Sequence, residues 1–198
     1  VPYMMREPKT ESDDIVVGKD ILELLSSSMY LDPLSIYREY VQNSADAIDE
    51  ALRCKIIDAR HDGRIDIRID HINRRVQIRD NGIGLGKSHF VRILKSFGAS
   101  QKRGTDARGF RGVGRLAGLG YSQKLVFRSR TSKDEPVMEL TWDGRLLQQL
   151  LNDPDYTGNL NEIVQSVTEV TEYDNDDAPE RFFEVDLNRV RRIGRDIL

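Results

Sequence analysis

The spacing of apolar residues changes several times along this chain and marks successive helices and strands. Apolar positions three and four residues apart predict a long helix over 33–53, which Asp32 is placed to cap. Apolar and polar residues then alternate over 65–69 and again over 76–78, which predicts two half-buried strands. Because only a short polar turn separates these strands, we expect them to form a hairpin.

Shorter segments with apolar periodicity occupy much of the remaining sequence. We expect helices over 21–25, 88–97, 113–119 and 145–151, and strands over 124–130, 137–141, 163–170 and 182–187. The acidic run 172–177 is expected to be a solvated hairpin loop. With 198 residues, of which 38% are hydrophobic, the chain is large enough for one well-cored domain, which we place at 15–190.

The two ends of the sequence lack this periodicity. Residues 1–14 are polar and are interpreted as an N-terminal arm that either crosses to a partner subunit or is disordered. Because the sequence begins at Val1 and stops shortly after Arg192, we expect an excised fragment, in which 191–198 begin a linker to a downstream region.

Charge and cysteine content narrow the class of protein. A net charge of −3 argues against extensive binding to nucleic acid or membranes, but between 87 and 115 eight basic residues occur with a single acid, Asp106. This local asymmetry suits an anionic ligand. The only cysteine, Cys54, excludes an internal disulfide and fits a cytoplasmic compartment, or a nuclear one in a eukaryote. No apolar run is long enough to cross a membrane.

Three polar residues share one face of the predicted helix 33–53. At about 100° per residue, Glu39, Asn43 and Asp46 lie within roughly 60° of one another. An amide oxygen can bind Mg²⁺, and a carboxylate one turn away can accept a proton from an attacking water. Seen alone, the same stripe is typical of a solvated helix face.

A second motif follows the predicted hairpin, where Asp80 ends a strand and Gly82 and Gly84 come next. The glycines permit a sharp turn and the close approach of a flat ligand. A carboxylate at this point can accept a hydrogen bond from an exocyclic amine such as that of adenine. The alternative is a simple tight turn, in which Asp-Asn-Gly is common.

A third motif is a glycine-rich loop that opens the predicted helix 113–119. It consists of Gly109, Phe110, Arg111, Gly112, Val113 and Gly114. Unpaired N–H groups at the start of a helix suit phosphate groups. A Rossmann site fails because no parallel strand leads into the glycines, and a Walker P-loop fails because no Gly-Lys-Ser/Thr follows them. In this order and spacing, the three motifs together indicate a pocket for Mg-ATP.

The same order and spacing resemble the GHKL ATPases, named for gyrase, the heat-shock chaperone, histidine kinases and MutL, over 15–130. The stretch 38–47 is similar to the N box of the chaperone and MutL branches. This resemblance implies that Glu39 is the general base and Asn43 the Mg²⁺ ligand, with Asp46 supporting the nucleotide. The family fold is a two-layer α/β (α+β) sandwich, in which a mixed, mostly antiparallel sheet has helices over one face and ATP lies between the layers.

The resemblance extends to the other two motifs. The Asp80 motif matches the box that binds adenine, and 109–114 match the box at the end of the ATP lid. The segment 98–102 resembles the lid entry of the MutL branch, which implies phosphate contacts from Ser100 and Lys102.

One feature of the family is replaced in this chain. Many members have a threonine just before the last strand, where this chain has Glu180-Arg181. Thr141 or Thr171 can take that role, or the contact is missing.

The resemblance implies a Mg²⁺-dependent module of a larger protein that hydrolyses ATP slowly and acts as a conformational or dimerisation switch. Its implied partners are ATP, a second copy in an ATP-dependent homodimer, downstream domains of the same chain, and a protein client or DNA, without a membrane. Chaperone-like, MutL-like and MORC-like roles all remain open.

Two other functions are considered. A histidine-kinase domain is disfavoured because that branch lacks the Asp-Ala ending found at Asp46-Ala47, and because no phosphoacceptor histidine on a dimerisation helix precedes the domain. The second is a non-hydrolysing nucleotide- or DNA-binding module. Its electrostatic footprint would be Arg189, Arg191, Arg192 and Arg195.

Overall fold

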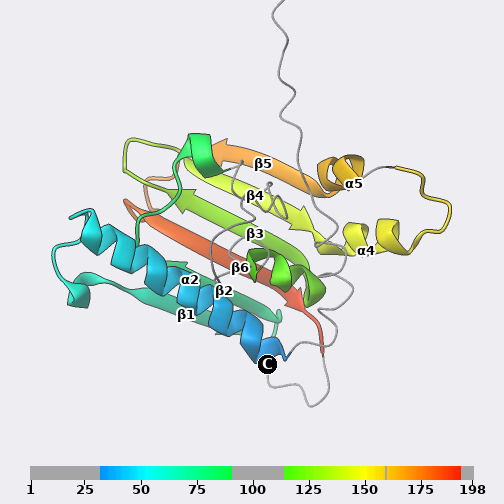
Figure 1. The fold of residues 1–198 in the computed structure, drawn as a ribbon, viewed down its shortest axis with the longest axis horizontal. Coiled ribbons are helices and arrows are strands. Elements are labelled where there is room, and N and C mark those ends of the chain that lie inside the picture. The colour runs from blue at the N-terminus through cyan, green and yellow to red at the C-terminus, as the bar shows by residue number, and fades with distance from the viewer. Residues whose placement is uncertain (1–31, 91–113, 159, 193–198) are drawn as a thin grey trace, which may run out of the picture.

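A six-stranded sheet with helices against one of its faces forms the fold (Figure 1). The computed structural model describes residues 32–90, 114–158 and 160–192. Its strands are β1 (Ile65–Asp70), β2 (Arg75–Asp80), β3 (Ser122–Arg130), β4 (Val137–Asp143), β5 (Thr168–Tyr173) and β6 (Phe182–Val190). Its helices are α2 (Pro33–Arg53), α4 (Gly144–Asn152) and α5 (Leu160–Val167), with short 3-10 helices η2 (Arg60–Asp62) and η3 (Gly114–Gly120).

The strands lie in the order β1-β2-β6-β3-β4-β5, and each neighbouring pair is antiparallel. The expected α+β sandwich with a mostly antiparallel sheet is therefore confirmed. The described strands include no parallel pair, so the sheet is not mixed in this part of the chain. The central strand β6 comes last in sequence, which means that the core closes only when distant segments meet.

Helix α2 forms where the sequence predicts it. It begins at Pro33, which has no N–H to satisfy in the first turn. The Asp32 side chain accepts a hydrogen bond from the Leu34 N–H at 3.2 Å, as expected for a cap. Ile36 and Tyr40 on one side of the helix are buried in the core. This packing turns the neighbouring polar stripe toward the space between helix and sheet.

One face of the sheet carries the hydrophobic core. Leu125 and Phe127 of β3, and Val185 and Leu187 of β6, are buried on this face and alternate with residues on the other. Residues of α2, η3, α4 and α5 belong to the same core cluster. The helices therefore cover this face, as the sequence-based fold class requires (Figure 1).

The opposite face of the sheet carries a network of ion pairs. Glu184 and Asp186 of β6 are 2% and 1% exposed, and Arg128 of β3 donates to both, at 2.8 and 2.9 Å. Arg75 and Arg79 of β2 contact the same two carboxylates from the other side, each at 2.6 Å. Burial alone raises the pKa of Asp186, but hydrogen bonds from Arg75 and Arg128 outweigh it and hold the pKa below its usual value. This network ties β6 to both of its neighbours.

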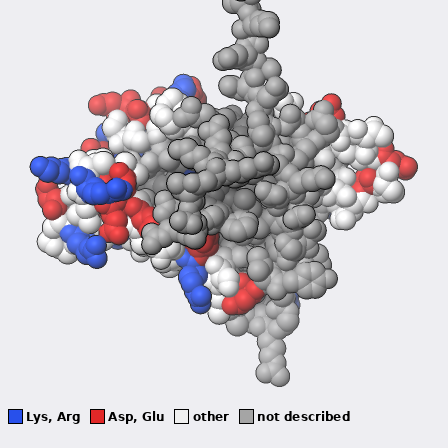
Figure 2. Space-filling view, viewed as in Figure 1, with Lys and Arg blue, Asp and Glu red and all other residues white. Residues whose placement is uncertain are grey.

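Near η2, the described residues form a surface that carries charges of both signs. Figure 2 shows Lys and Arg side chains interspersed with Asp and Glu at this end of the molecule. One such pair joins Arg60 and Asp49 at 3.2 Å, with both side chains exposed. Exposed pairs of this kind contribute little to stability.

The strand predicted over 163–170 is wrong. Leu160–Val167 form the helix α5, and β5 begins only after it. Ile163, Val164 and Val167 lie on one side of this helix and are buried in the core. Their β-branched side chains suggested a strand, but tertiary packing of a helical spacing decides the structure.

Two further expectations change in detail. The acidic run 172–177 does not form a hairpin loop, because β5 lies at the sheet edge beside β4, whereas β6 lies between β2 and β3. The segment after the glycine-rich loop is a 3-10 helix, η3, rather than an α-helix. The expected helix 21–25, the arm 1–14, the later part of 88–97 and residues 193–198 lie outside the described residues.

Candidate functional site

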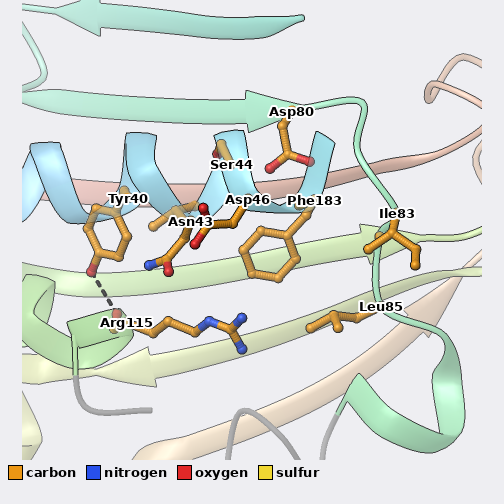
Figure 3. Close-up of a pocket in the computed structure, with 12 residues that line it drawn as sticks. Tyr40, Asn43, Ser44, Asp46, Asp80, Ile83, Leu85, Arg115 and Phe183 are labelled. Atoms are coloured by element: carbon orange, nitrogen blue, oxygen red, sulfur yellow. Dashed lines mark hydrogen bonds between the residues drawn. The ribbon is translucent and has the colours of Figure 1, made fainter. Parts of the chain in front are cut away.

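A pocket of about 190 Å³ lies between α2 and the sheet, at the end of β2 (Figure 3). Its walls come from α2, the loop after β2, η3 and β6. The lining residues are Tyr40, Asn43, Ser44, Asp46, Ala47, Asp80, Ile83, Gly84, Leu85, Arg115, Phe183 and Val185. The structure thus brings together residues of the first two sequence motifs, which are more than thirty residues apart in the chain.

Asp80 is the buried acid of this pocket. It is 2% exposed, and its Oδ1 accepts a hydrogen bond from the Gly82 N–H at 2.9 Å. Its Oδ2 is also buried, yet has no hydrogen-bond partner among the residues that the structure describes. Burial raises the pKa of Asp80 from 3.8 to about 6. The Gly82 hydrogen bond, the Ser44 side chain and the charge of Arg115 each lower this pKa, but they offset burial only in part. A buried acceptor without a donor is a rare arrangement that suits a ligand.

Two glycines fix the loop that carries Asp80 into the pocket. A Cβ on Gly82 would lie 2.6 Å from the backbone of Ala47 in α2. Gly84 has a φ of +68°, and a Cβ there would lie 2.7 Å from the carbonyl oxygen of Arg130. These glycines therefore let the loop pack closely against other backbone segments of the protein. Gly84 also lines the pocket.

The polar stripe of α2 is divided between the pocket and its margin. Asn43 and Asp46 line the pocket, and the side-chain amide of Asn43 donates to Oε1 of Glu39 at 3.4 Å. Asp46 is exposed, and its Oδ1 accepts a hydrogen bond from Gln42 at 3.0 Å. Within the described residues, no group of three or more His, Cys, Asp or Glu side chains is placed to hold a metal ion.

Arg115, which the sequence motifs do not single out, reaches from η3 into the pocket (Figure 3). Its Nε is buried and has no hydrogen-bond partner in the described part of the chain. Burial lowers the pKa of Arg115, whereas the charges of Glu39 and Asp80 raise it. The signal was its position directly after the glycine-rich motif. Phe183 is not singled out either, because nothing in a strand of alternating residues distinguishes a pocket wall from core.

Tyr40 connects α2 to η3 at the floor of the pocket. Its hydroxyl donates to the carbonyl oxygen of Arg115 at 2.7 Å and accepts from the Gly118 N–H at 3.0 Å. Burial raises the pKa of Tyr40 well above its usual value, and the Gly118 hydrogen bond only partly offsets this. The neutral hydroxyl therefore holds Arg115 in place through the backbone.

Replacing Tyr40 with phenylalanine is expected to lower the free energy of unfolding by about 1–3 kcal/mol, because the buried Gly118 N–H loses its acceptor. Urea unfolding followed by circular dichroism measures this change. The control is Tyr156→Phe, since the Tyr156 hydroxyl has no hydrogen bond to the described residues. Equal unfolding midpoints for both variants would contradict the expectation.

Arg181, just before β6, holds the loop after β2 through hydrogen bonds to its backbone. Its Nε donates to the carbonyl oxygen of Gly82 at 2.8 Å, and its Nη2 to that of Asn81 at 3.4 Å. Neither Thr141 nor Thr171 is among the described residues that line the pocket. Arg181 occupies that place before the last strand and contacts backbone rather than the pocket itself.

Several expected site residues lie outside the described residues. They are Ser100, Lys102, Gly109, Phe110, Arg111, Gly112 and Val113. Gly114 is the first residue of η3. The structure thus brings the Asp80 motif beside α2 and places the end of the glycine-rich motif at η3, next to Arg115.

A helix-covered antiparallel sheet with this pocket defines a class of nucleotide-binding ATPase domains, and comparison with known proteins agrees. Residues 35–175 match the family described as histidine kinase-, DNA gyrase B- and HSP90-like ATPase. The chain belongs to this family, and its relatives lie on the heat-shock-chaperone branch of the GHKL ATPases.

The curated relatives include bacterial proteins named chaperone protein HtpG. The one from Klebsiella pneumoniae is 27% identical over 143 residues, which cover 63% of this chain and 23% of the relative. The one from Rickettsia akari is 27% identical over 159 residues, covering 72% and 25%. The one from Mycolicibacterium gilvum is 36% identical over 93 residues, covering 44% and 14%. The chain spans about a quarter or less of the length of these relatives.

None of the helices in the described residues has both the length and the apolar character needed to span a membrane.

Proposed function

We propose that this chain binds Mg-ATP in the pocket between α2 and the sheet and hydrolyses it slowly. The observation that carries the proposal is the buried Oδ2 of Asp80, which lacks a donor among the described residues. The exocyclic amine of adenine is such a donor, and the apolar walls from Ile83, Leu85 and Phe183 suit a flat aromatic ring.

The residues of α2 fit the metal and the hydrolytic step. Asn43 uses its amide nitrogen to bond Glu39, which leaves its amide oxygen to bind Mg²⁺. Bound Mg²⁺ would neutralise charge on the phosphates. Glu39, held by Asn43, is the candidate base that takes a proton from the attacking water. Asp46, farther along the stripe, is proposed to support the nucleotide.

Arg115 adds a cation to the same pocket. Its buried Nε can donate to the nucleotide, and its charge lies near Asp80 and Glu39. Ser100, Lys102 and the glycine-rich residues 109–114 are proposed to contact the phosphates. With these groups the pocket has a carboxylate, that of Asp80, for the adenine ring and cations for the phosphates.

The wider role is proposed from the relatives. Because they are named chaperones, we propose that nucleotide binding switches the conformation or self-association of this chain and of downstream domains attached to it, to act on protein clients. The described residues favour neither phosphate transfer to a histidine nor a DNA-bound role.

The ionisation of Asp80 gives a pH test of the base contact. Because its pKa is about 6, Asp80 is ionised at pH 7.5 and accepts the adenine amine, whereas at pH 5 it is mostly protonated. Affinity is therefore expected to fall about tenfold between pH 7.5 and pH 5. Adenosine is the ligand for this titration, because it has no phosphate that titrates in this range. A constant affinity would contradict the proposed contact.

Arg181 is proposed to position the base-binding loop. Replacing it with alanine frees the carbonyl groups of Asn81 and Gly82 and is expected to weaken ATP binding about tenfold, with Arg181→Lys in between. The discrimination between ATP and ITP, whose base lacks the exocyclic amine, should fall as well, which a purely structural role would not cause. Arg189→Ala, an exposed arginine on β6, is the control. Unchanged discrimination would contradict the assignment.

A further inference from the structure

The strand β1 forms one edge of the described sheet (Figure 1), and two of its apolar side chains are exposed. β1 is the outermost strand and, within the described residues, pairs only with β2. Ile67 and Ile69 are each 51% exposed, although they lie opposite the core residues Ile78 and Val76 and share their face. An open edge with exposed apolar side chains is a template for another strand, and proteins normally protect such edges.

The hydrogen bonds of the hairpin show which backbone groups point outward. The Asn81 N–H donates to the carbonyl oxygen of Arg64 at 3.2 Å, and the Arg64 N–H donates to the Asn81 side chain at 2.7 Å. In an antiparallel ladder, residues that bond to the neighbouring strand alternate with residues that face away. Every second residue from Arg64 therefore bonds to β2. The N–H and C=O groups of Ile65, Ile67 and Ile69 point to the open edge.

We propose that β1 pairs antiparallel with β1 of a second copy of this chain, with Ile67 facing the second copy's Ile67 across a two-fold axis. In this register Ile65 and Ile69 pair with each other across the interface, so all three isoleucines use their outward backbone groups. Asp66 then lies directly opposite the second copy's Arg68, and symmetry repeats this pair. The interaction surface is therefore self-complementary.

Charge selects this register over its neighbours. The smallest shift that keeps the outward backbone groups paired moves the two-fold axis by one residue along the strand. In one direction this shift places Asp66 opposite the second copy's Asp66, and in the other it places Arg68 opposite the second copy's Arg68. Opposite charges across two strands stabilise their pairing, and like charges destabilise it. Arg68 has no ion-pair partner among the described residues, whereas Asp66 pairs at 3.0 Å with Arg64, which directly precedes β1. Arg68 is thus available to the second copy.

The same pairing covers the exposed isoleucines. Side chains of directly opposite residues point to the same face of a sheet, so the isoleucines of both copies meet on the side where α2 lies. The contact joins the two sheets into one and removes the open edge from both copies. It uses no residue of the pocket and requires no nucleotide, so it stands apart from the proposed function.

Sedimentation equilibrium of the full 198-residue chain without nucleotide tests this inference. The unmodified chain should form dimers. Asp66→Arg and Arg68→Asp each place two like-charge pairs in the interface and should weaken self-association about tenfold or more. An equal mixture of the two variants should form heterodimers, because every arginine then faces an aspartate. A monomeric unmodified chain, or variants that remain separate when mixed, would overturn the proposal.

A backbone variant separates strand pairing from general surface contact. Ile67→Pro removes the N–H at the two-fold axis but no hydrogen bond to β2, so the fold should persist while the dimer is lost. Ile72→Ser is the matched control, because Ile72 is 92% exposed in the turn beyond β1 and should leave the dimer intact. Circular dichroism verifies that each variant is folded. Dimerisation of folded Ile67→Pro at the unmodified strength would show that the interface lies elsewhere.

Discussion

Replacing Asp80 with asparagine is expected to weaken ATP binding at least about 100-fold. Asparagine can still accept the Gly82 hydrogen bond through its oxygen, but its amide nitrogen then replaces the Oδ2 that lacks a donor. That nitrogen would face the exocyclic amine of adenine, donor against donor. Titration calorimetry with a non-hydrolysable ATP analogue measures the loss. Asp49→Asn, an exposed acid on α2, is the control and should bind normally.

The same substitution should make the free chain more stable at pH 7. Because the pKa of Asp80 is raised from 3.8 to about 6, the folded chain holds this proton more tightly than the unfolded chain. The free energy of unfolding therefore falls as pH rises from about 4 to about 6, and the full cost is present at pH 7. Removing the charge should recover about 1–2 kcal/mol at pH 7. A variant that loses both binding and stability would indicate a structural defect instead.

Replacing Glu39 with alanine is expected to lower the rate of ATP hydrolysis by about 100-fold or more while ATP binding changes little. Glu39 is not one of the described residues that line the pocket, although it accepts a hydrogen bond from Asn43 and its charge acts on Arg115. Its removal should therefore leave the adenine contact of Asp80 intact. Phosphate release under saturating ATP measures turnover, and the calorimetric assay measures binding.

The matched control for this variant is Asp49→Ala, which removes a carboxylate from the exposed side of the same helix. It should hydrolyse ATP at the unmodified rate. If Glu39→Ala also keeps normal turnover, then Glu39 is not the base. If it loses binding together with turnover, then its role is to hold Asn43 rather than to accept a proton.

Local patterns predict the elements of this fold well where one face of an element is buried. The capped start of α2, the hairpin of β1 and β2, and the strands β3, β4 and β6 all follow from spacing and capping. The segment 163–170 was misassigned because β-branched residues favour strands locally, whereas the core selects the helical face of Ile163 and Val167. The sheet order could not be predicted, since it depends on contacts between distant segments.

The site could be predicted from sequence only where its residues belong to recognisable motifs. Asp80, Gly84 and Asn43 come together as the motif spacing suggests. Arg115 and Arg181 were not identified, because their roles depend on where η3 and the start of β6 lie relative to the loop after β2. A burial-dependent property, such as the raised pKa of Asp80, also cannot be derived from sequence alone.

The most direct test of the central claim is equilibrium binding of a non-hydrolysable ATP analogue to this chain, measured by calorimetry with and without Mg²⁺. If the proposed function is correct, one analogue per chain binds saturably, Mg²⁺ strengthens the binding, and Asp80→Asn abolishes it. Absence of binding under both conditions by a folded chain, or binding that Asp80→Asn leaves unchanged, would contradict it.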